Sequence, residues 1–314
     1  MPSLLRLPLF LDRKSTPPVD VLLCGVPFES RSFRPGTGFG ARALRDASAW
    51  SRPFSGALGV DVFGEIAVAD GGDVNIASDS ADAALEAVAA HAEAMARSGV
   101  IPGFAGGDQV VTLGALTGLR RAKHRALGLL HFGAHPGASA GQTLDASRFV
   151  RVAVSEGLVR ADSTLQVGLR GPYASADERS FGFSRGIDTA GVDDVRWDLH
   201  AAVGQVRRLV RKGAVYVTVD IGVLDPAFAP GASYPVPGGL SSWELQQLLR
   251  ALVGAEIAGF DVVGISPSFD SSGITALAGV MVLQEILATV ADTRRSAGPA
   301  PSTRRSGRPG RRSA

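Results

Sequence analysis

Residues 214–226 read AVYVTVDIGVLDP, an apolar run of strand length that ends in an acid and a turn. Further apolar runs of similar length lie at residues 20–25, 99–104, 126–132, 164–169 and 259–265. Stretches with the apolar spacing of a helix separate them, at residues 81–97, 195–211, 242–253 and 274–291. Because strands and helices alternate, the pattern predicts a mostly parallel sheet with helices on both faces, a three-layer α/β/α fold.

The length and composition of the chain limit its class. The 314 residues suffice for one large α/β domain or two small ones, and 45% are hydrophobic, so a sizeable core can form. No apolar run approaches a membrane span and the N-terminus lacks a secretory pattern, so we expect a cytoplasmic protein with no membrane partner. The single Cys24 excludes an internal disulfide, and its apolar surroundings indicate a buried structural thiol.

The last segment of the chain differs in composition from the rest. Residues 293–314 contain seven Arg and no acid among Gly, Pro, Ser and Ala, so we expect a disordered basic tail after one domain over residues 1–292. Removing these seven charges from the net charge of +2 leaves −5 for the body. No aromatic residue interleaves with the arginines, so we expect a solvated extension and no nucleic-acid partner.

Three loops combine glycines with polar residues directly after predicted strands. They read GGDQ at residues 106–109, HFGAHPG at residues 131–137 and VDIGVLDP at residues 219–226. Ligands bind outside the carboxyl ends of the strands in open parallel sheets, so we expect the functional site where these loops meet. His131, at a strand end, is predicted to be packed or backbone-bonded, and Asp225 and Asp270 are predicted to be turn or capping residues.

These loops resemble the metal-site loops of the ureohydrolase (arginase/agmatinase) family, which read GGDH, FDAHxD and DxDxxDP. Further matching segments within residues 20–291 are GVPF (25–28), RPGT (34–37), GFG (38–40), GLRG (168–171), PGGL (237–240) and DVV (261–263). The resemblance implies an arginase-like fold, a small-molecule substrate and a homo-oligomer, either a trimer or a hexamer.

By this resemblance, six positions hold manganese ligands in active relatives, and here they are Gln109, Gly133, His135, Gly137, Asp220 and Gly222. A dinuclear site needs imidazoles and carboxylates that can bridge two ions about 4 Å apart. Only His135 and Asp220 are ligands of that kind. The resemblance therefore implies no metal and no other cofactor for this chain.

The same comparison predicts the character of the pocket. The acid that grips a guanidinium group in the family corresponds to Gly264, and a loop threonine corresponds to Tyr234. We therefore expect an enlarged, nearly uncharged pocket without arginase or agmatinase activity. Its expected substrate-binding residues are Asp108, Gln109, Gly133, Gly137, Gly222, Tyr234 and Gly264. The expected catalytic residues are His135 and Asp220, which should lie close enough to act as a general acid/base pair.

Three functional hypotheses stay open at this point. The first is an enzyme of specialised metabolism, repurposed for metal-independent acid/base chemistry on a small, less polar substrate. The second is a non-catalytic subunit that assembles with itself or with an active relative. The third is a residual carbon–nitrogen hydrolase that holds one metal through His135 and Asp220.

Overall fold

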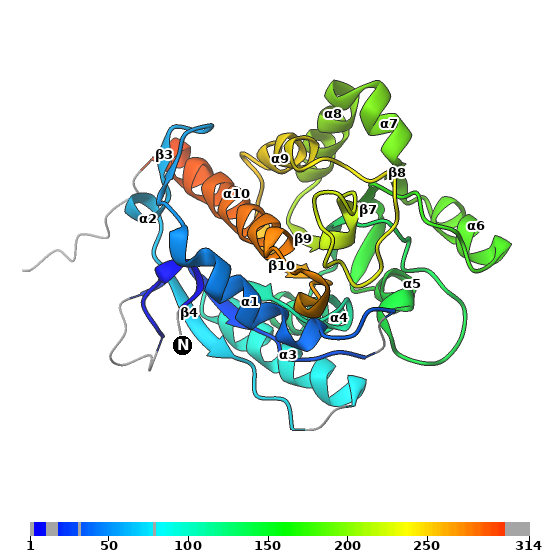
Figure 1. Ribbon diagram of the computed structural model, residues 1–314, viewed down its shortest axis with the longest axis horizontal. Coiled ribbons are helices and arrows are strands. Elements are labelled where there is room, and N and C mark those ends of the chain that lie inside the picture. The colour runs from blue at the N-terminus through cyan, green and yellow to red at the C-terminus, as the bar shows by residue number, and fades with distance from the viewer. Residues whose placement is uncertain (1–2, 11–17, 31–32, 78–79, 299–314) are drawn as a thin grey trace, which may run out of the picture.

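The computed structural model describes residues 3–10, 18–30, 33–77 and 80–298. At its centre is an eight-stranded sheet in which every neighbouring pair of strands is parallel (Figure 1). The strand order is β4 (Val68–Asp73), β1 (Val21–Gly25), β5 (Ile101–Ala105), β10 (Ile257–Val263), β9 (Val215–Asp220), β6 (Leu127–Phe132), β7 (Val159–Val167) and β8 (Asp188–Ala190). The predicted α/β fold with a mostly parallel sheet is confirmed.

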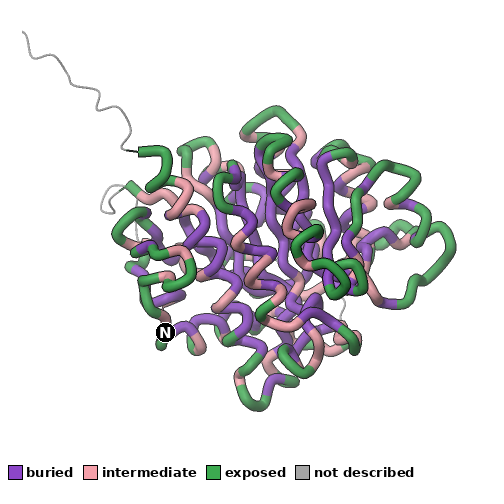
Figure 2. The backbone as a smooth tube through the Cα atoms, turned by 90° about the horizontal axis from the view of Figure 1, so that it is seen from above, coloured by how far each residue is buried: buried purple, intermediate pink, exposed green. Residues whose placement is uncertain are grey.

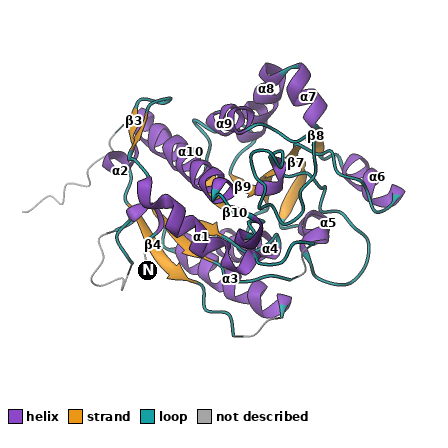
Figure 3. Ribbon diagram, in the orientation of Figure 1, coloured by secondary structure: helices purple, strands orange, loops and turns teal. Residues whose placement is uncertain are grey.

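Helices cover both faces of the sheet, which gives the expected three layers (Figure 3). One core cluster contains the buried faces of α3 (Ala81–Arg97), α4 (Val110–Lys123) and α5 (Phe149–Ser155). A second cluster contains those of α1 (Gly40–Ala47), α8 (Leu199–Val210), α9 (Ser242–Arg250) and α10 (Ile274–Ala297). The remaining elements are α2 (Val62–Glu65), α6 (Ala176–Arg185), α7 (Val192–Trp197) and an antiparallel pair, β2 (Phe54–Ser55) and β3 (Val60–Asp61). Buried backbone runs through the interior and exposed segments surround it (Figure 2).

The predicted elements match this architecture with specific exceptions. All six predicted strands are present, but β4 and β8 were not expected, because β4 contains two glycines and β8 has three residues. The single helix expected at residues 195–211 is two helices, α7 and α8. They separate at Asp198, whose side chain accepts a hydrogen bond from Ala201 N and so caps α8. Tertiary packing and capping therefore decide boundaries that periodicity alone does not.

The C-terminal helix corrects the expected domain boundary. Helix α10 continues to Ala297, so the boundary predicted at residue 293 falls inside it. The rest of the predicted tail, residues 299–314, lies outside the described residues. By length and composition α10 could cross a membrane, but 72% of its most apolar window is buried inside the molecule. Helix α10 packs beside α1 from the other end of the chain, so it is a core helix (Figure 1).

Helices α3 and α4 pack backbone against backbone. A Cβ atom at Gly114 would lie 2.8 Å from Leu85 O, and one at Gly118 would collide with Ala89 O. Only glycine permits this approach. The contact sets the position of α4, whose first turn follows Gln109.

A buried ion pair joins α1 to β4. Arg45 Nε lies 3.0 Å from Asp70 Oδ2 and Arg45 Nη2 lies 3.1 Å from Asp70 Oδ1, with the two side chains 7% and 0% exposed. Asp70 also accepts hydrogen bonds from Leu4 N and Gly72 N.

Cys24 is a free, buried thiol, as predicted, and its burial raises its pKa to about 12.

Candidate functional site

The loops after β5, β6 and β9 meet at the carboxyl edge of the sheet, as the sequence predicts. They border a cavity of about 200 Å³. Of the predicted site residues, the cavity is lined by Gln109, His135, Gly137, Asp220 and Tyr234. Asp108, Gly133, Gly222 and Gly264 are not among its lining residues. The structure therefore brings together about half of the predicted set, and adds His131, Phe149 and Glu178, which were not expected to bind substrate.

The cavity carries negative charge. Asp220 and Glu178 both line it, and no lysine or arginine is among the described residues that do so. Glu178, in α6 and only 6% exposed, accepts hydrogen bonds from Ser139 Oγ at 2.7 Å and Ala174 N at 2.6 Å. Burial raises the pKa of Asp220 to about 6, against the lowering effect of a hydrogen bond from Gly222 N. The prediction of a nearly uncharged pocket is wrong, because Glu178 comes from a segment outside the three loops.

The glycines of the site do not open extra space. A Cβ atom at Gly133 would collide with the His131 ring, and one at Gly137 would lie 2.5 Å from the Phe149 ring. A Cβ atom at Gly264, whose φ is +80°, would lie 2.5 Å from Asp220 Oδ1. Neighbouring side chains thus occupy the volume beside these three glycines. The prediction of a pocket enlarged at these positions is also wrong.

Asp108 stabilises the loop after β5 and does not line the cavity. Its carboxylate accepts hydrogen bonds from Ser30 N at 2.7 Å, Ser30 Oγ at 2.5 Å and Val110 N at 2.9 Å. The preceding Gly106 and Gly107 have φ of +83° and +73°, and a Cβ at Gly106 would lie 2.5 Å from Ala41 N. These contacts place the next residue, Gln109, at the cavity wall.

Gln109 connects the cavity to a buried polar cluster formed by Thr112, Tyr216, Thr218 and Asp261. As placed, Gln109 Oε1 lies 2.7 Å from Thr112 Oγ1 and 3.3 Å from Thr218 Oγ1. Gln109 Nε2 is then buried without a protein partner. Thr218, Thr112 and Tyr216 place their hydroxyls 2.5, 2.8 and 2.8 Å from the carboxylate oxygens of Asp261.

Asp261 should make stability depend on pH. Burial raises its folded-state pKa to about 6, above an unfolded value near 3.8. The folded state therefore holds an extra proton between these pH values, and the stabilisation is complete below pH 3.8 and lost as pH rises through 6. Relative to Asp261→Asn, the wild type should gain about 1.4 kcal/mol per pH unit as pH falls across this window. Denaturant unfolding of both proteins from pH 7.5 to 4 measures the difference, and parallel curves would exclude it.

His131 is packed as predicted, and it also reaches the cavity. Gln166 Nε2 lies 2.9 Å from His131 Nδ1 and donates to Pro136 O at 2.8 Å. Because a carbonyl only accepts, the amide nitrogen of Gln166 faces both partners, so His131 Nδ1 accepts and the ring proton lies on Nε2. Burial lowers the pKa of His131 to about 3, so the ring is neutral at pH 7. Its ring meets that of Phe149 edge to face.

His135 and Asp220 line one cavity but are not joined. Within the described part of the chain, they share no hydrogen bond and no ion pair. His135 Nε2 is buried without a partner, and its ring lies edge-on to Tyr234 at 6.1 Å between centroids. Burial lowers the pKa of His135, and the charge of Arg170 lowers it further. The direct Asp–His contact that a general acid/base pair needs is therefore absent between these side chains.

Arg170 organises the loops behind the cavity, a role that no sequence pattern indicated. Its guanidinium donates to the carbonyl oxygens of Gly168, Gly222, Val223, Leu224 and Val236, at 2.7 to 3.2 Å. Asp225 accepts hydrogen bonds from Ala227 N in its own turn and from Gly238 N and Gly239 N in a later loop. Asp270 caps α10 through Thr275 N and Ala276 N. The predicted turn and capping roles of these two acids are confirmed.

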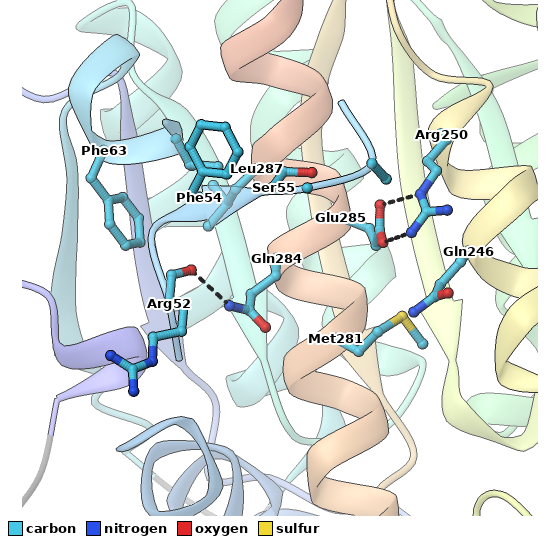
Figure 4. A pocket seen from close by; sticks show the side chains of 13 residues that line it. Arg52, Phe54, Ser55, Phe63, Gln246, Arg250, Met281, Gln284, Glu285 and Leu287 are labelled. Atoms are coloured by element: carbon cyan, nitrogen blue, oxygen red, sulfur yellow. Dashed lines mark hydrogen bonds and ion pairs between the residues drawn. The ribbon is translucent and has the colours of Figure 1, made fainter. Parts of the chain in front are cut away.

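A second cavity of about 210 Å³ lies between α9, α10 and the β2–β3 pair (Figure 4). Two of the charged side chains that line it form an ion pair, in which Arg250 donates to both oxygens of Glu285 at 3.0 and 2.5 Å. Gln284 Nε2 donates to Arg52 O at 3.2 Å. None of the three predicted loops contributes to it.

Comparison with known proteins identifies the family. The model of the arginase family matches residues 19–289. This chain belongs to the arginase family. It is similar to a guanidinopropionase of Pseudomonas aeruginosa, with 33% identity over 93% of this chain and 92% of that protein. An agmatinase of Cronobacter sakazakii is 36% identical over 90% of this chain and 91% of its own length. The structure of proclavaminate amidino hydrolase from Streptomyces clavuligerus superposes with a TM-score of 0.86, at 29% identity over 93% of this chain and 98% of that chain.

These arginase-family relatives overturn the function expected from the sequence. The three hypotheses, a repurposed metal-independent enzyme, a non-catalytic subunit and a one-metal remnant, all started from the acids missing at the loop positions. A guanidinopropionase, a guanidinobutyrase and agmatinases resemble this chain at 32–36% identity over about nine-tenths of its length. They point instead to a ureohydrolase, so the prediction of a repurposed, metal-independent enzyme acting on a less polar substrate is wrong.

Proposed function

We propose that this arginase-family chain hydrolyses a carbon–nitrogen bond of a small guanidino compound bound in the carboxyl-edge cavity. The observation that carries the proposal is the charge of that cavity. Two carboxylates line it, the buried Glu178 and the half-buried Asp220, and no described lysine or arginine does. A guanidinium group keeps its positive charge at neutral pH and offers planar N–H donors to carboxylates. The names of the relatives supply the same substrate class.

The reaction balances as a simple hydrolysis. The oxygen of water bonds to the guanidino carbon, the bond from that carbon to the alkylated nitrogen breaks, and urea and an amine leave. The chain's own contribution is binding. Asp220 and Glu178 offset the charge of the cation, and a partly desolvated site strengthens that attraction.

We also propose that this member has a reduced set of metal ligands. Among the six positions that the resemblance gives to manganese, His135 and Asp220 are the imidazole and the carboxylate, and three of the others are glycines. In the part of the chain that the structure describes, no group of three or more His, Cys, Asp or Glu side chains could hold a metal ion. These residues do not fit a two-manganese site, which needs several carboxylates to offset two dications.

Urea release tests the proposed hydrolysis. The full-length protein, with and without added Mn²⁺, is expected to release urea from at least one of guanidinopropionate, guanidinobutyrate and agmatine. Glu178→Gln removes one cavity carboxylate and should raise KM about ten-fold, as the loss of one charge-assisted hydrogen bond does. Glu256→Gln, the same change at a side chain that is 60% exposed, should have no effect.

The measurements are urea by colorimetry and the amine product by mass spectrometry, with a guanidinopropionase as the positive control. No urea from any of the three compounds, by a protein with a cooperative unfolding transition, would overturn the proposal. Elemental analysis of the same preparation tests the reduced ligand set, since two Mn per chain would contradict it.

We propose that the protein acts in the cytoplasm. We also propose that it forms a homo-oligomer, either a trimer or a hexamer, because members of the arginase family are commonly oligomeric. Light scattering coupled to size-exclusion chromatography measures the number of subunits, and a monomer would exclude both states.

A further inference from the structure

The side-chain amide of Gln109 separates the cavity from the buried cluster of Thr112, Tyr216, Thr218 and Asp261. Gln109 is 5% exposed and lines the cavity, while all four cluster residues are 0% exposed. The oxygen and nitrogen of an amide exchange places by a half turn with almost no change in shape, so the hydrogen bonds must decide which end faces the cavity.

The hydrogens of the cluster can be counted. Six short contacts lie within reach of a hydrogen: Thr218 to Asp261 Oδ1, Thr112 and Tyr216 to Asp261 Oδ2, Thr112 to Thr218, and each threonine to the amide of Gln109. The three hydroxyls supply one hydrogen each. Asp261 as a carboxylate supplies none, and the pKa of about 6 leaves it mostly ionised at pH 7. Three contacts are therefore left without a hydroxyl hydrogen. The amide of Gln109 can supply the two that involve it, and the 3.1 Å contact between the two threonines then holds no hydrogen.

The alternative leaves oxygens in contact without a hydrogen between them. Suppose that the amide oxygen of Gln109 faces the cluster. Thr112 has one hydroxyl hydrogen, so if it donates to that oxygen it cannot also donate to Asp261 Oδ2, which lies 2.8 Å away. A lone pair would then face a buried carboxylate, which is costly where solvent is excluded. With the nitrogen facing the cluster, Gln109 donates to Thr112 Oγ1 and more weakly to Thr218 Oγ1, and all three hydroxyls donate to Asp261. The buried amide nitrogen then has a partner.

We infer that Gln109 presents its side-chain carbonyl oxygen to the cavity and accepts an N–H hydrogen of the substrate's guanidino group. This inference rests on the proposed function for its substrate. The carbonyl oxygen shares the cavity with the carboxylates of Asp220 and Glu178, so the cavity offers acceptors from several directions. A guanidinium carries only donors, whereas an isosteric urea group places a carbonyl oxygen against one of these acceptors. Gln109 is therefore a specificity-determining residue.

Ligand binding tests this role. Calorimetric titration, with urea release measured alongside so that the heat of hydrolysis is subtracted, compares guanidinobutyrate with its carbamoyl isostere, ureidobutyrate, on wild type, Gln109→Met and Gln246→Met. Gln109→Met should weaken guanidinobutyrate binding about ten-fold and leave ureidobutyrate unchanged or improved. Gln246→Met, a matched change in the second cavity, should leave both affinities unchanged. An equal loss for both ligands, or no loss for guanidinobutyrate, would overturn the inference.

The orientation is measured separately, in the ligand-free wild type. Nuclear Overhauser contacts from the Gln109 amide hydrogens to the methyl groups of Thr112 and Thr218 are expected, with the signal assigned by its absence in Gln109→Met. Amide hydrogens without these contacts would overturn the orientation even if guanidinobutyrate binds. The expected contacts together with no guanidino binding would leave the orientation intact and overturn the proposed substrate, so the two failures are distinguishable.

Discussion

Replacement of Asp70 by alanine is expected to lower the free energy of unfolding by about 3–5 kcal/mol. The change removes the acceptor of two guanidinium contacts and leaves Arg45, 7% exposed, with Asp73 as its ion-pair partner. It also removes the acceptor of the backbone N–H groups of Leu4 and Gly72. A charge left buried without its full complement of partners costs more than the intact pair ever contributes. Denaturant unfolding measures the loss.

Two further variants are controls that test whether burial of the charge causes this loss of stability. Asp73→Ala removes a carboxylate that contacts the same guanidinium but is 43% exposed, and should cost less than about 1 kcal/mol. The double variant Arg45→Met with Asp70→Leu buries no charge, so it should be more stable than Asp70→Ala alone. Equal losses for Asp70→Ala and Asp73→Ala would show that burial does not govern this pair.

Replacement of Arg170 by lysine is expected to lower the free energy of unfolding by about 2–3 kcal/mol, although the charge is kept. The planar guanidinium reaches five carbonyl oxygens from residues 168 to 236, and a compact ammonium group cannot reach all of them. Carbonyls left without donors destabilise the loop that follows Asp220. Backbone amides of residues 221–224 should therefore exchange with deuterium faster than in the wild type.

Arg196→Lys is the matched control, because Arg196 donates to one carbonyl, that of Gly239. It should cost less than about 1 kcal/mol, with unchanged exchange at residues 221–224. If the two variants are equally stable, the number of carbonyls that Arg170 reaches does not matter.

Strands and the edge of the site could be predicted because they depend on local pattern. Apolar runs mark the strands, and the polar loops after β5, β6 and β9 must meet at one edge of a parallel sheet. The cavity wall could not be predicted, because its shape depends on how side chains turn. His131 and Phe149 fill the volume beside Gly133 and Gly137, and nothing in the spacing of these residues indicates it.

The prediction of a nearly uncharged pocket failed for a related reason. It counted acids at six positions and took their absence for an absence of charge. Glu178, which lies on α6 and belongs to none of the matching segments, brings a carboxylate to the cavity from elsewhere. Arg170 belongs to a matching segment, but its five carbonyl partners lie mostly on loops that only the folded chain brings near it. Charge in a folded site depends on three-dimensional neighbours, which residue identity at aligned positions does not report.

The order of strands in the sheet has a consequence for synthesis of the protein. Strand β10 (Ile257–Val263) lies between β5 and β9, so the middle of the sheet is completed by its last strand. Until residue 263 has left the ribosome, β5 and β9 each have one edge without a partner. Such edges pair readily with other chains, and contacts between distant segments form slowly. A nascent chain of this protein is therefore exposed to aggregation until translation is nearly complete, and a chaperone would be most useful during that interval.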